Sequence, residues 1–248
     1  MDVGGRDENV DAGVARFIDR AQRCVDVFVF PSQFARAKYF EAGWPAAKLV
    51  VKYNTTLDHA AVRADGRSGF ACVSRFTTEK GVDVLLDAWP RAFPDGSQSL
   101  QIVGSGEEEA ALRIAARRAT GVEFSGNLGR AETLDMLARS LALVVPSRCY
   151  EVFPRVVAEA YAAGVPVIAA RLGALAEMVE DETTGLLFEP GSAEDLAHAL
   201  ERLTASPRLA ATLGRNARRA YESHFSPEQT TQSLLAIYDA AVHCNKAA

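Results

Sequence analysis

Two carboxylates, Glu151 and Glu159, lie eight positions apart in the stretch Glu-Val-Phe-Pro-Arg-Val-Val-Ala-Glu-Ala-Tyr-Ala-Ala-Gly-Val-Pro-Val. Pro154 suits the first turn of a helix, so we expect Glu151 just before that helix and Glu159 inside it. Free backbone N–H groups at a helix start favour an anion such as a diphosphate. Carboxylates beside them accept hydrogen bonds from hydroxyl groups, which a sugar or a ribose offers. The spacing therefore predicts a site for a phosphate-bearing ligand with hydroxyl groups.

Glu159 allows two interpretations. As a surface residue of the helix, it would be an ordinary solvated carboxylate. Its neighbours are apolar on nearly every side of the helix, among them Val156, Val157 and Ala160. Because a carboxylate among apolar residues needs a partner, this setting favours a functional Glu159.

A polar segment, Ser-Arg-Phe-Thr-Thr-Glu-Lys-Gly at residues 74–81, follows an apolar run. In a parallel sheet this position is the carboxyl edge, where ligands bind. Arg75 offers a planar fork for phosphate oxygens and Lys80 a mobile point charge. The alternative is a solvated turn in which Lys80 lies near a helix start by chance.

The turn Val103-Gly-Ser-Gly-Glu-Glu-Glu resembles half of a dinucleotide-binding fingerprint. Glu109 stands where the third glycine would be, and the three glutamates would repel a pyrophosphate. A plain strand-to-helix turn is therefore favoured, and an NAD site is not expected.

Two other turns follow apolar runs. At residues 124–129 the backbone could pair with a nucleobase edge, with Asn127 capping or steering the turn. At residues 173–177, Gly-Ala-Leu-Ala-Glu is either a phosphate or sugar cradle or a simple turn.

Short apolar runs alternate with amphipathic stretches along most of the chain. Runs rich in Val and Ile, separated by helices, indicate a parallel sheet covered on both faces. The fold class is therefore α/β, a doubly wound parallel sheet of Rossmann-like type. The expected strands are Val25–Phe30, Leu49–Tyr53, Phe70–Val73, Leu100–Val103, Val122–Phe124, Leu141–Val145, Val165–Ala169 and Gly185–Phe188. The expected helices are 11–23, 32–43, 81–93, 107–118, 131–139, 154–163, 173–180 and 193–204, followed by a helical tail over 206–223 and 228–243.

The polar segment Thr55–Ser68 interrupts the alternation and is expected to be a linker or an exposed excursion. We expect extra N-terminal elements and linker over 1–62, the main domain over 63–225, and a C-terminal helix over 226–248. Ser226-Pro227-Glu228 is typical of a helix start.

Composition excludes several classes of protein. The net charge of −5 gives no basic field for nucleic acid. The four cysteines and four histidines are dispersed, which favours reduced thiols and predicts no metal site. No apolar run is long enough to span a membrane. The expected setting is the cytoplasm, either free or peripherally at the inner membrane.

Together these elements resemble the C-terminal, donor-binding domain of the glycosyl transferases group 1 family, the retaining enzymes of GT-B fold. The match runs in order from about residue 25 to about residue 243, and its most specific part is the paired-glutamate element with the Gly-x-Pro-Val after it. The matching pieces are Ser74-Arg75…Glu79-Lys80-Gly81, Val103-Gly-Ser-Gly106, Pro146-Ser147, Glu151-x7-Glu159, Ala163-Gly164-Val-Pro166-Val, Gly173…Glu177 and Gly185-Leu-Leu-Phe188.

The resemblance implies a role for each candidate residue. Arg75 and Lys80 would hold the donor diphosphate, and Glu151 would contact the transferred sugar; these three form the catalytic set. Glu159 would bind the ribose hydroxyls. The other donor-binding residues would be Asn127 and Leu128 at the base, and Phe153, Arg155 and Val156 at the helix entry. The family requires no cofactor and no metal, so the cations and the helix start would stabilise the leaving diphosphate.

Two departures from the family matter. Its usual Gly-Phe-Gly after the first glutamate is Val152-Phe153-Pro154 here, which predicts a shifted sugar specificity. Residues 1–54 resemble only the last pieces of the N-terminal, acceptor-binding domain of such enzymes. We therefore expect a partner chain carrying that domain, or self-association. A non-catalytic module that binds a nucleotide-sugar is the alternative, and a GT-B epimerase or phosphorylase is less favoured.

Overall fold

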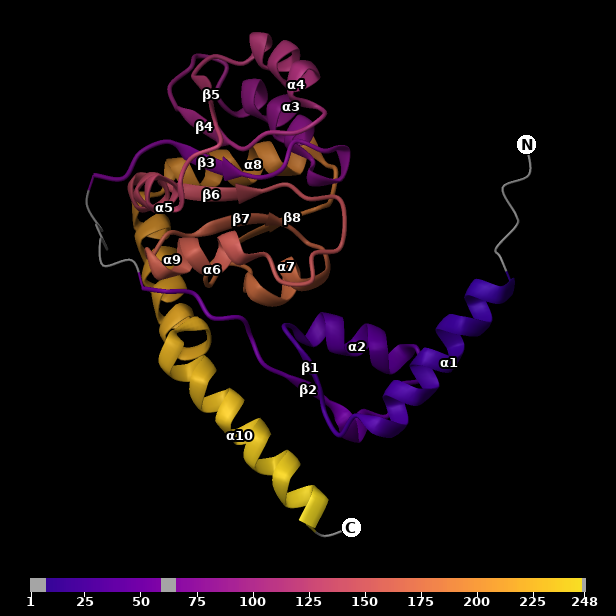
Figure 1. Ribbon diagram of the computed structural model, residues 1–248. Coiled ribbons are helices and arrows are strands. Elements are labelled where there is room, and N and C mark those ends of the chain that lie inside the picture. Colours follow the sequence, from indigo (N-terminus) through magenta and orange to yellow (C-terminus); the bar gives the residue numbers. More distant parts are fainter. Residues whose placement is uncertain (1–7, 59–65, 247–248) are drawn as a thin grey trace.

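A computed structural model describes residues 8–58 and 66–246. Its centre is a parallel sheet of six strands in the order β5-β4-β3-β6-β7-β8, with helices on both faces (Figure 1). The strands are β3 (Phe70–Val73), β4 (Leu100–Val103), β5 (Val122–Gly126), β6 (Ala142–Val145), β7 (Val167–Ala170) and β8 (Gly185–Phe188). Every residue of β6 and β7 is buried, as both faces of a parallel sheet require. The doubly wound sheet predicted from the sequence is confirmed.

Each face of the sheet has its own apolar core. One core is formed with α3 (Val82–Ala92), α4 (Glu109–Ala115) and α8 (Ala193–Ala205). The other is formed with α5 (Arg130–Arg139), α6 (Arg155–Ala162) and α7 (Gly173–Met178). Helix α9 (Pro207–Ala220) contributes to both and packs against α6 and α8.

A smaller unit precedes this domain. Strands β1 (Phe28–Phe30) and β2 (Leu49–Val51) pair in parallel, and α2 (Gln33–Glu41) covers them. Its core is small, consisting of Phe30, Ala35 and Leu49 with Phe28 and Trp44 against them. Helices α1 (Glu8–Cys24) and α10 (Pro227–Lys246) extend away from the sheet (Figure 1).

All eight expected strands are present, and the differences lie at their ends. The run expected from Val165 starts two residues later, at Val167. Gly164 adopts a positive φ of 66°, and the N–H of Val165 donates to the carbonyl of Ala160 to close α6. Pro166 has no N–H to give to a neighbouring strand. The expected helix over 107–118 is α4 followed by a short 3-10 turn, Ala116–Arg118. Helix α10 begins at Pro227, as expected.

The two described ends of the linker are attached to the main domain. Thr56 is buried, and its N–H donates to the carbonyl of Phe225. Arg67 donates to the carbonyls of Ala138, Ala163 and Gly164, and burial lowers the pKa of its guanidinium. Most of the other described residues at these ends are exposed, as expected of a linker, so Thr56 and Arg67 are its attachment points. The expected boundary between 62 and 63 lies outside the described residues.

Candidate active site

The loops that follow β3, β4, β5 and β6 meet at the carboxyl edge of the sheet, where three adjoining cavities lie. The largest, about 590 Å³, is lined by Arg75, Lys80, Ser147, Glu151 and residues 153–156. A second, about 340 Å³, is lined by Arg75, Ser105, Asn127 and Leu128, and a third, about 460 Å³, by Leu128, Arg155, Val156 and Glu159. Neighbouring cavities share lining residues, so we treat them as one feature, the edge cleft. All nine candidate residues from the sequence line it.

An ion pair lies in the largest cavity of the edge cleft. The Lys80 Nζ atom lies 2.5 Å from Glu151 Oε1, and the Ser147 hydroxyl donates to the same oxygen at 2.9 Å. The two charged side chains are only 16% and 19% exposed. The pair is therefore shielded from water on most sides while it still borders the cavity. Ser147 is therefore a further residue of the site, and its partner four positions along the chain is Glu151.

Gly81 lets the two loops of this pair approach each other. Its φ is +68°, and a Cβ atom there would lie 2.0 Å from the carbonyl oxygen of Pro146. The N–H of Arg148 also donates to the carbonyl of Glu79 at 2.8 Å. Backbone contact thus fixes Lys80 beside the loop that carries Glu151.

Arg75 lies on the same loop as Lys80, with an exposed guanidinium at the junction of two cavities. Within 8–58 and 66–246, no carboxylate pairs with it at salt-bridge distance. It is therefore a cation available to an anion in the cleft.

The glycines at 104 and 106 serve packing. A Cβ atom on Gly104 would lie 1.8 Å from the carbonyl oxygen of Ser74, and one on Gly106 would meet the backbone of Phe76 at 2.4 Å. The N–H of Glu108 donates to the carbonyl of Phe76. These contacts agree with the interpretation of this segment as a turn between strand and helix.

Helix α6 begins at Arg155, one residue later than expected, with Pro154 as its N-cap. Its first N–H groups, including those of Arg155 and Val156, have no partner within the helix. Both residues line the edge cleft. The start of α6 therefore adds backbone donors and the positive end of the helix dipole to this cleft.

Glu159 lies in the second turn of α6, and its side chain is 15% exposed. Burial raises the pKa of its carboxyl, an effect that nearby Arg155 and Arg130 oppose. Arg155 approaches only to 3.9 Å, and in the described part of the chain no hydrogen bond reaches the carboxylate. Glu159 is thus a shielded acceptor at a cavity wall, which fits the functional interpretation.

At the far end of the edge cleft, the turns after β4 and β5 are joined. The Asn127 amide donates to the Ser105 hydroxyl at 2.9 Å, and the N–H of Gly104 donates to the carbonyl of Gly126 at 2.8 Å. Asn127 therefore bridges two turns. Sequence reasoning missed Ser105 because its partner lies on another strand.

Glu177 lies outside the edge cleft. Its carboxylate accepts hydrogen bonds from the N–H groups of Gln33 and Phe34, at 2.9 and 2.8 Å, and from the Tyr53 hydroxyl at 3.0 Å. Burial raises the pKa of Tyr53 to about 12, and Glu177 adds to the effect. This carboxylate attaches the N-terminal unit to α7, so its side chain is already engaged and the segment does not act as a free cradle.

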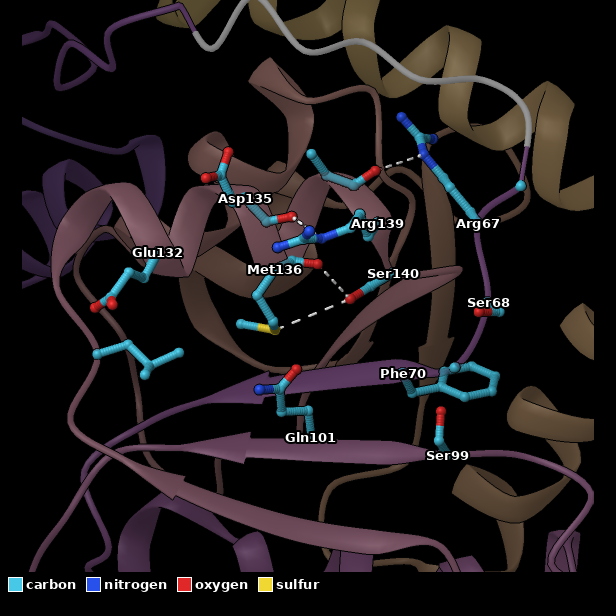
Figure 2. A pocket seen from close by; sticks show the side chains of 14 residues that line it. Arg67, Ser68, Phe70, Ser99, Gln101, Glu132, Asp135, Met136, Arg139 and Ser140 are labelled. Atoms are coloured by element: carbon cyan, nitrogen blue, oxygen red, sulfur yellow. Dashed lines mark hydrogen bonds between the residues drawn. The ribbon is translucent and has the colours of Figure 1, made fainter.

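Another cavity of about 590 Å³ lies beside α5 near the start of β3 (Figure 2). Some of the polar groups drawn there are bonded within the wall: the Ser140 hydroxyl donates to the Met136 carbonyl at 2.8 Å, and Arg139 Nε to the Asp135 carbonyl at 3.1 Å. It shares only Leu128 with the edge cleft. We therefore assign the chemistry to the edge cleft, which contains the candidate residues.

The described ranges contain neither a metal-ligand cluster nor a membrane-spanning helix. No group of three or more His, Cys, Asp or Glu side chains there is placed to hold a metal ion. No helix there is both long and apolar enough to cross a bilayer.

Comparison with known proteins identifies relatives. The D-inositol 3-phosphate glycosyltransferase of Saccharomonospora viridis is 40% identical over 185 residues, 69% of this chain and 42% of that protein. The GDP-mannose-dependent monoacylated alpha-(1-6)-phosphatidylinositol monomannoside mannosyltransferase of Corynebacterium glutamicum is 31% identical over 238 residues, 86% of this chain and 62% of that protein. The chain thus spans about half the length of the curated relatives it matches.

Solved structures show the same fold. The Anabaena protein Alr3699/HepE, crystallised in complex with UDP, superposes with a TM-score of 0.82 over 92% of this chain and 68% of its own, at 23% identity. The sucrose-phosphate synthase of Thermosynechococcus elongatus gives 0.76 over 98% of this chain and 64% of its own, at 25% identity. The fold is therefore the C-terminal half of a GT-B fold with N-terminal βα elements and a C-terminal helix. The sequence profile described as glycosyl transferases group 1 matches residues 67–206, and the chain belongs to that family.

Proposed function

We propose that this chain is the donor-binding half of a retaining, hexosyl-type glycosyltransferase, which transfers a sugar from a nucleotide-diphosphate-sugar to an acceptor. The observation that carries the proposal is the edge cleft itself. One continuous surface gathers two cations, a helix start, and two shielded carboxylates from loops far apart in the sequence. The cations and the helix start suit the phosphates of such a donor, and the carboxylates suit its hydroxyl groups.

The donor would lie along the edge cleft in one direction. The diphosphate meets Lys80, Arg75 and the first N–H groups of α6, which together offset the charge of the leaving group. The sugar lies beside Glu151 and Phe153, in the cavity of about 590 Å³.

The nucleoside occupies the other two cavities. Its ribose hydroxyls donate to Glu159, whose carboxylate has oxygen atoms to offer. The base lies at the backbone of Asn127 and Leu128. Retention is attributed to attack on the same face of the sugar that the diphosphate leaves.

Pro154 would alter how the sugar is held. As the N-cap of α6 it contributes no N–H at the position next to Phe153. A sugar here has one fewer backbone donor than in the usual Gly-Phe-Gly loop. We infer a shift in sugar specificity with donor binding kept.

Three segments would have separate tasks. Residues 1–62 would belong to the acceptor-binding side and the linker, 63–225 would bind the donor, and 226–248 would cross back toward the acceptor side. Phe17 on α1 and Tyr238 on α10 are 72% and 60% exposed, and they offer apolar surface to a separate N-terminal domain chain or a second copy.

A non-catalytic nucleotide-sugar-binding or scaffold module is the second candidate. It would use the same edge cleft to bind the donor. Both candidates require donor binding, and only the first requires transfer.

Calorimetry of the full chain with UDP, GDP and ADP tests the shared part of both candidates. Binding of one diphosphate in the micromolar to millimolar range supports them, whereas no binding of any of the three contradicts both. Sugar transfer after a matched N-terminal domain is supplied would select the enzyme over the binding module.

A further inference from the structure

Ser32, at the start of α2, is hydrogen-bonded to a loop of the edge cleft. Its hydroxyl donates to the carbonyl oxygen of Val152 at 2.7 Å and accepts the N–H of Ala35 at 3.1 Å. The residue is 0% exposed. One buried hydroxyl therefore caps α2 and fixes a loop 120 residues further along the chain.

Glu177 holds α2 in the position that this hydrogen bond requires. It accepts the N–H groups of Gln33 and Phe34, the two residues after Ser32. The ring of Phe34 lies 4.8 Å from that of Tyr150, just before Glu151. The loop is thus held on both sides of Glu151, by a ring contact before it and a hydrogen bond after it.

The loop of residues 150–153 borders only one end of the edge cleft. Val152 stands between Glu151, which pairs with Lys80, and Phe153, which lines the same cavity. Asn127 and Glu159 lie in the other two cavities, on β5–α5 and in the second turn of α6, and Ser32 bonds to neither. A shift of the loop would therefore change the sugar end and leave the nucleoside end in place.

We propose that Ser32 is a positioning residue for sugar recognition: its hydrogen bond to the Val152 carbonyl sets Glu151 and Phe153 against the sugar of the donor. This inference rests on the proposed function, since it takes the donor to be a nucleotide-diphosphate-sugar. It assigns part of the sugar selectivity to the N-terminal unit, outside the donor-binding domain.

The test compares two calorimetric titrations of the full chain. One uses the nucleoside diphosphate that binds, and the other uses the same diphosphate linked to a sugar. The sugars tried are glucose, galactose, mannose and N-acetylglucosamine. In Ser32→Ala the Val152 carbonyl loses its donor, and we expect Kd for the nucleotide-sugar to rise about fivefold or more. We expect Kd for the diphosphate alone to rise by a smaller factor, because the diphosphate reaches the loop only through Lys80 and the start of α6, whereas the sugar lies directly against Glu151 and Phe153.

Two variants separate positioning from general stability. Ser32→Thr keeps the hydroxyl and should restore most of the sugar affinity. Ser206→Ala removes a comparable N-cap, that of α9, where the hydroxyl accepts the N–H of Leu209 far from the edge cleft. It should lower the melting temperature and change neither affinity.

Glu177→Gln weakens the contact between α7 and the start of α2, which holds Ser32 in place. It is the variant to measure if Ser32→Ala does not fold. It should weaken the nucleotide-sugar selectively, in the same direction as Ser32→Ala. Equal weakening of both ligands, or no change in either, overturns the inference while the proposed function stands. Failure of the wild-type chain to bind any diphosphate contradicts the proposed function instead.

Discussion

Lys80 and Glu151 are 71 residues apart in the chain, and their charged atoms lie 2.5 Å apart in the edge cleft. Each side chain is less than one-fifth exposed, so each depends on the other for its charge to be tolerated. A donor diphosphate beside Lys80 would compete for this ammonium and leave Glu151 with the hydroxyl of Ser147. The pair would thus link anion binding at Lys80 to the carboxylate that we propose lies next to the sugar.

Replacing Lys80 should therefore weaken diphosphate binding strongly. Lys80→Ala removes a charge-assisted contact worth roughly 1.5–3 kcal/mol, which corresponds to about tenfold to a hundredfold in Kd. Calorimetry with the diphosphate that binds wild type measures the change. Arg202→Ala, which breaks the ion pair with Glu182 on the surface, is the matched control and should bind as wild type. Unchanged affinity in Lys80→Ala would remove Lys80 from the donor site.

Glu159 should give nucleotide binding a distinct pH dependence. Burial raises the pKa of this carboxyl above its ordinary value of 4.5, and only the ionised form accepts from two ribose hydroxyls. Affinity should therefore fall as the pH is lowered through the raised pKa, at a higher pH than an ordinary glutamate would cause. Titrations between pH 4.5 and 8 with wild type and Glu159→Gln isolate this contribution, because phosphate protonation is common to both proteins. Parallel pH profiles would contradict the assignment.

The burial of Glu159 should also make the stability of the free protein depend on pH. A carboxyl with a raised folded pKa disfavours folding when ionised, so its cost is absent below the unfolded pKa and develops as the pH rises through the folded value. Glu159→Gln should therefore be more stable than wild type near pH 7, and the difference should vanish near pH 4. Urea unfolding at the two pH values measures it. A variant less stable at pH 7 would indicate an unrecognised structural partner.

Gly81 should not tolerate a side chain. Gly81→Ala places Cβ against the Pro146 carbonyl oxygen at a positive φ, and we expect a loss of more than about 2 kcal/mol in urea unfolding. Gly191→Ala has a similar φ of +79° but no atom within 4 Å, so it reports the backbone strain alone. Equal losses in the two variants would show that the loop contact is not required.

Helix α10 should promote self-association. Leu235, Tyr238 and Val242 are more than half exposed and recur at helical spacing along one side. We expect light scattering to show a mass that rises with concentration, and Leu235→Glu with Tyr238→Glu to suppress the rise. Ser233→Glu with Ala240→Glu adds the same charge on the opposite side and should leave it unchanged. A strict monomer at high concentration would refute self-association.

The sequence was sufficient to predict the sheet, because buried parallel strands are continuous apolar runs and glycines mark the turns between them. It also placed the candidate residues together, since loops after parallel strands share one edge. The partners of individual side chains were not predictable in this way. Glu177 lies 144 residues from Gln33, and Ser32 lies 120 from Val152. Such contacts arise from how the N-terminal unit packs on α7, which no local pattern records.

Helix α6 is electrostatically complemented at both ends. At its carboxyl end, Arg218 donates to the carbonyl of Ala162 and Arg67 to those of Ala163 and Gly164, where the helix dipole is negative. Its amino end is positive and opens into the edge cleft. The two guanidinium groups offset the negative carboxyl end of α6, and a phosphate in the cleft would offset its positive amino end. Charges of opposite sign would then alternate along the helix axis, from arginine through the helix dipole to phosphate. The two arginines come from the linker and from α9. The electrostatic environment at the carboxyl end of α6 therefore depends on segments that do not border the cleft.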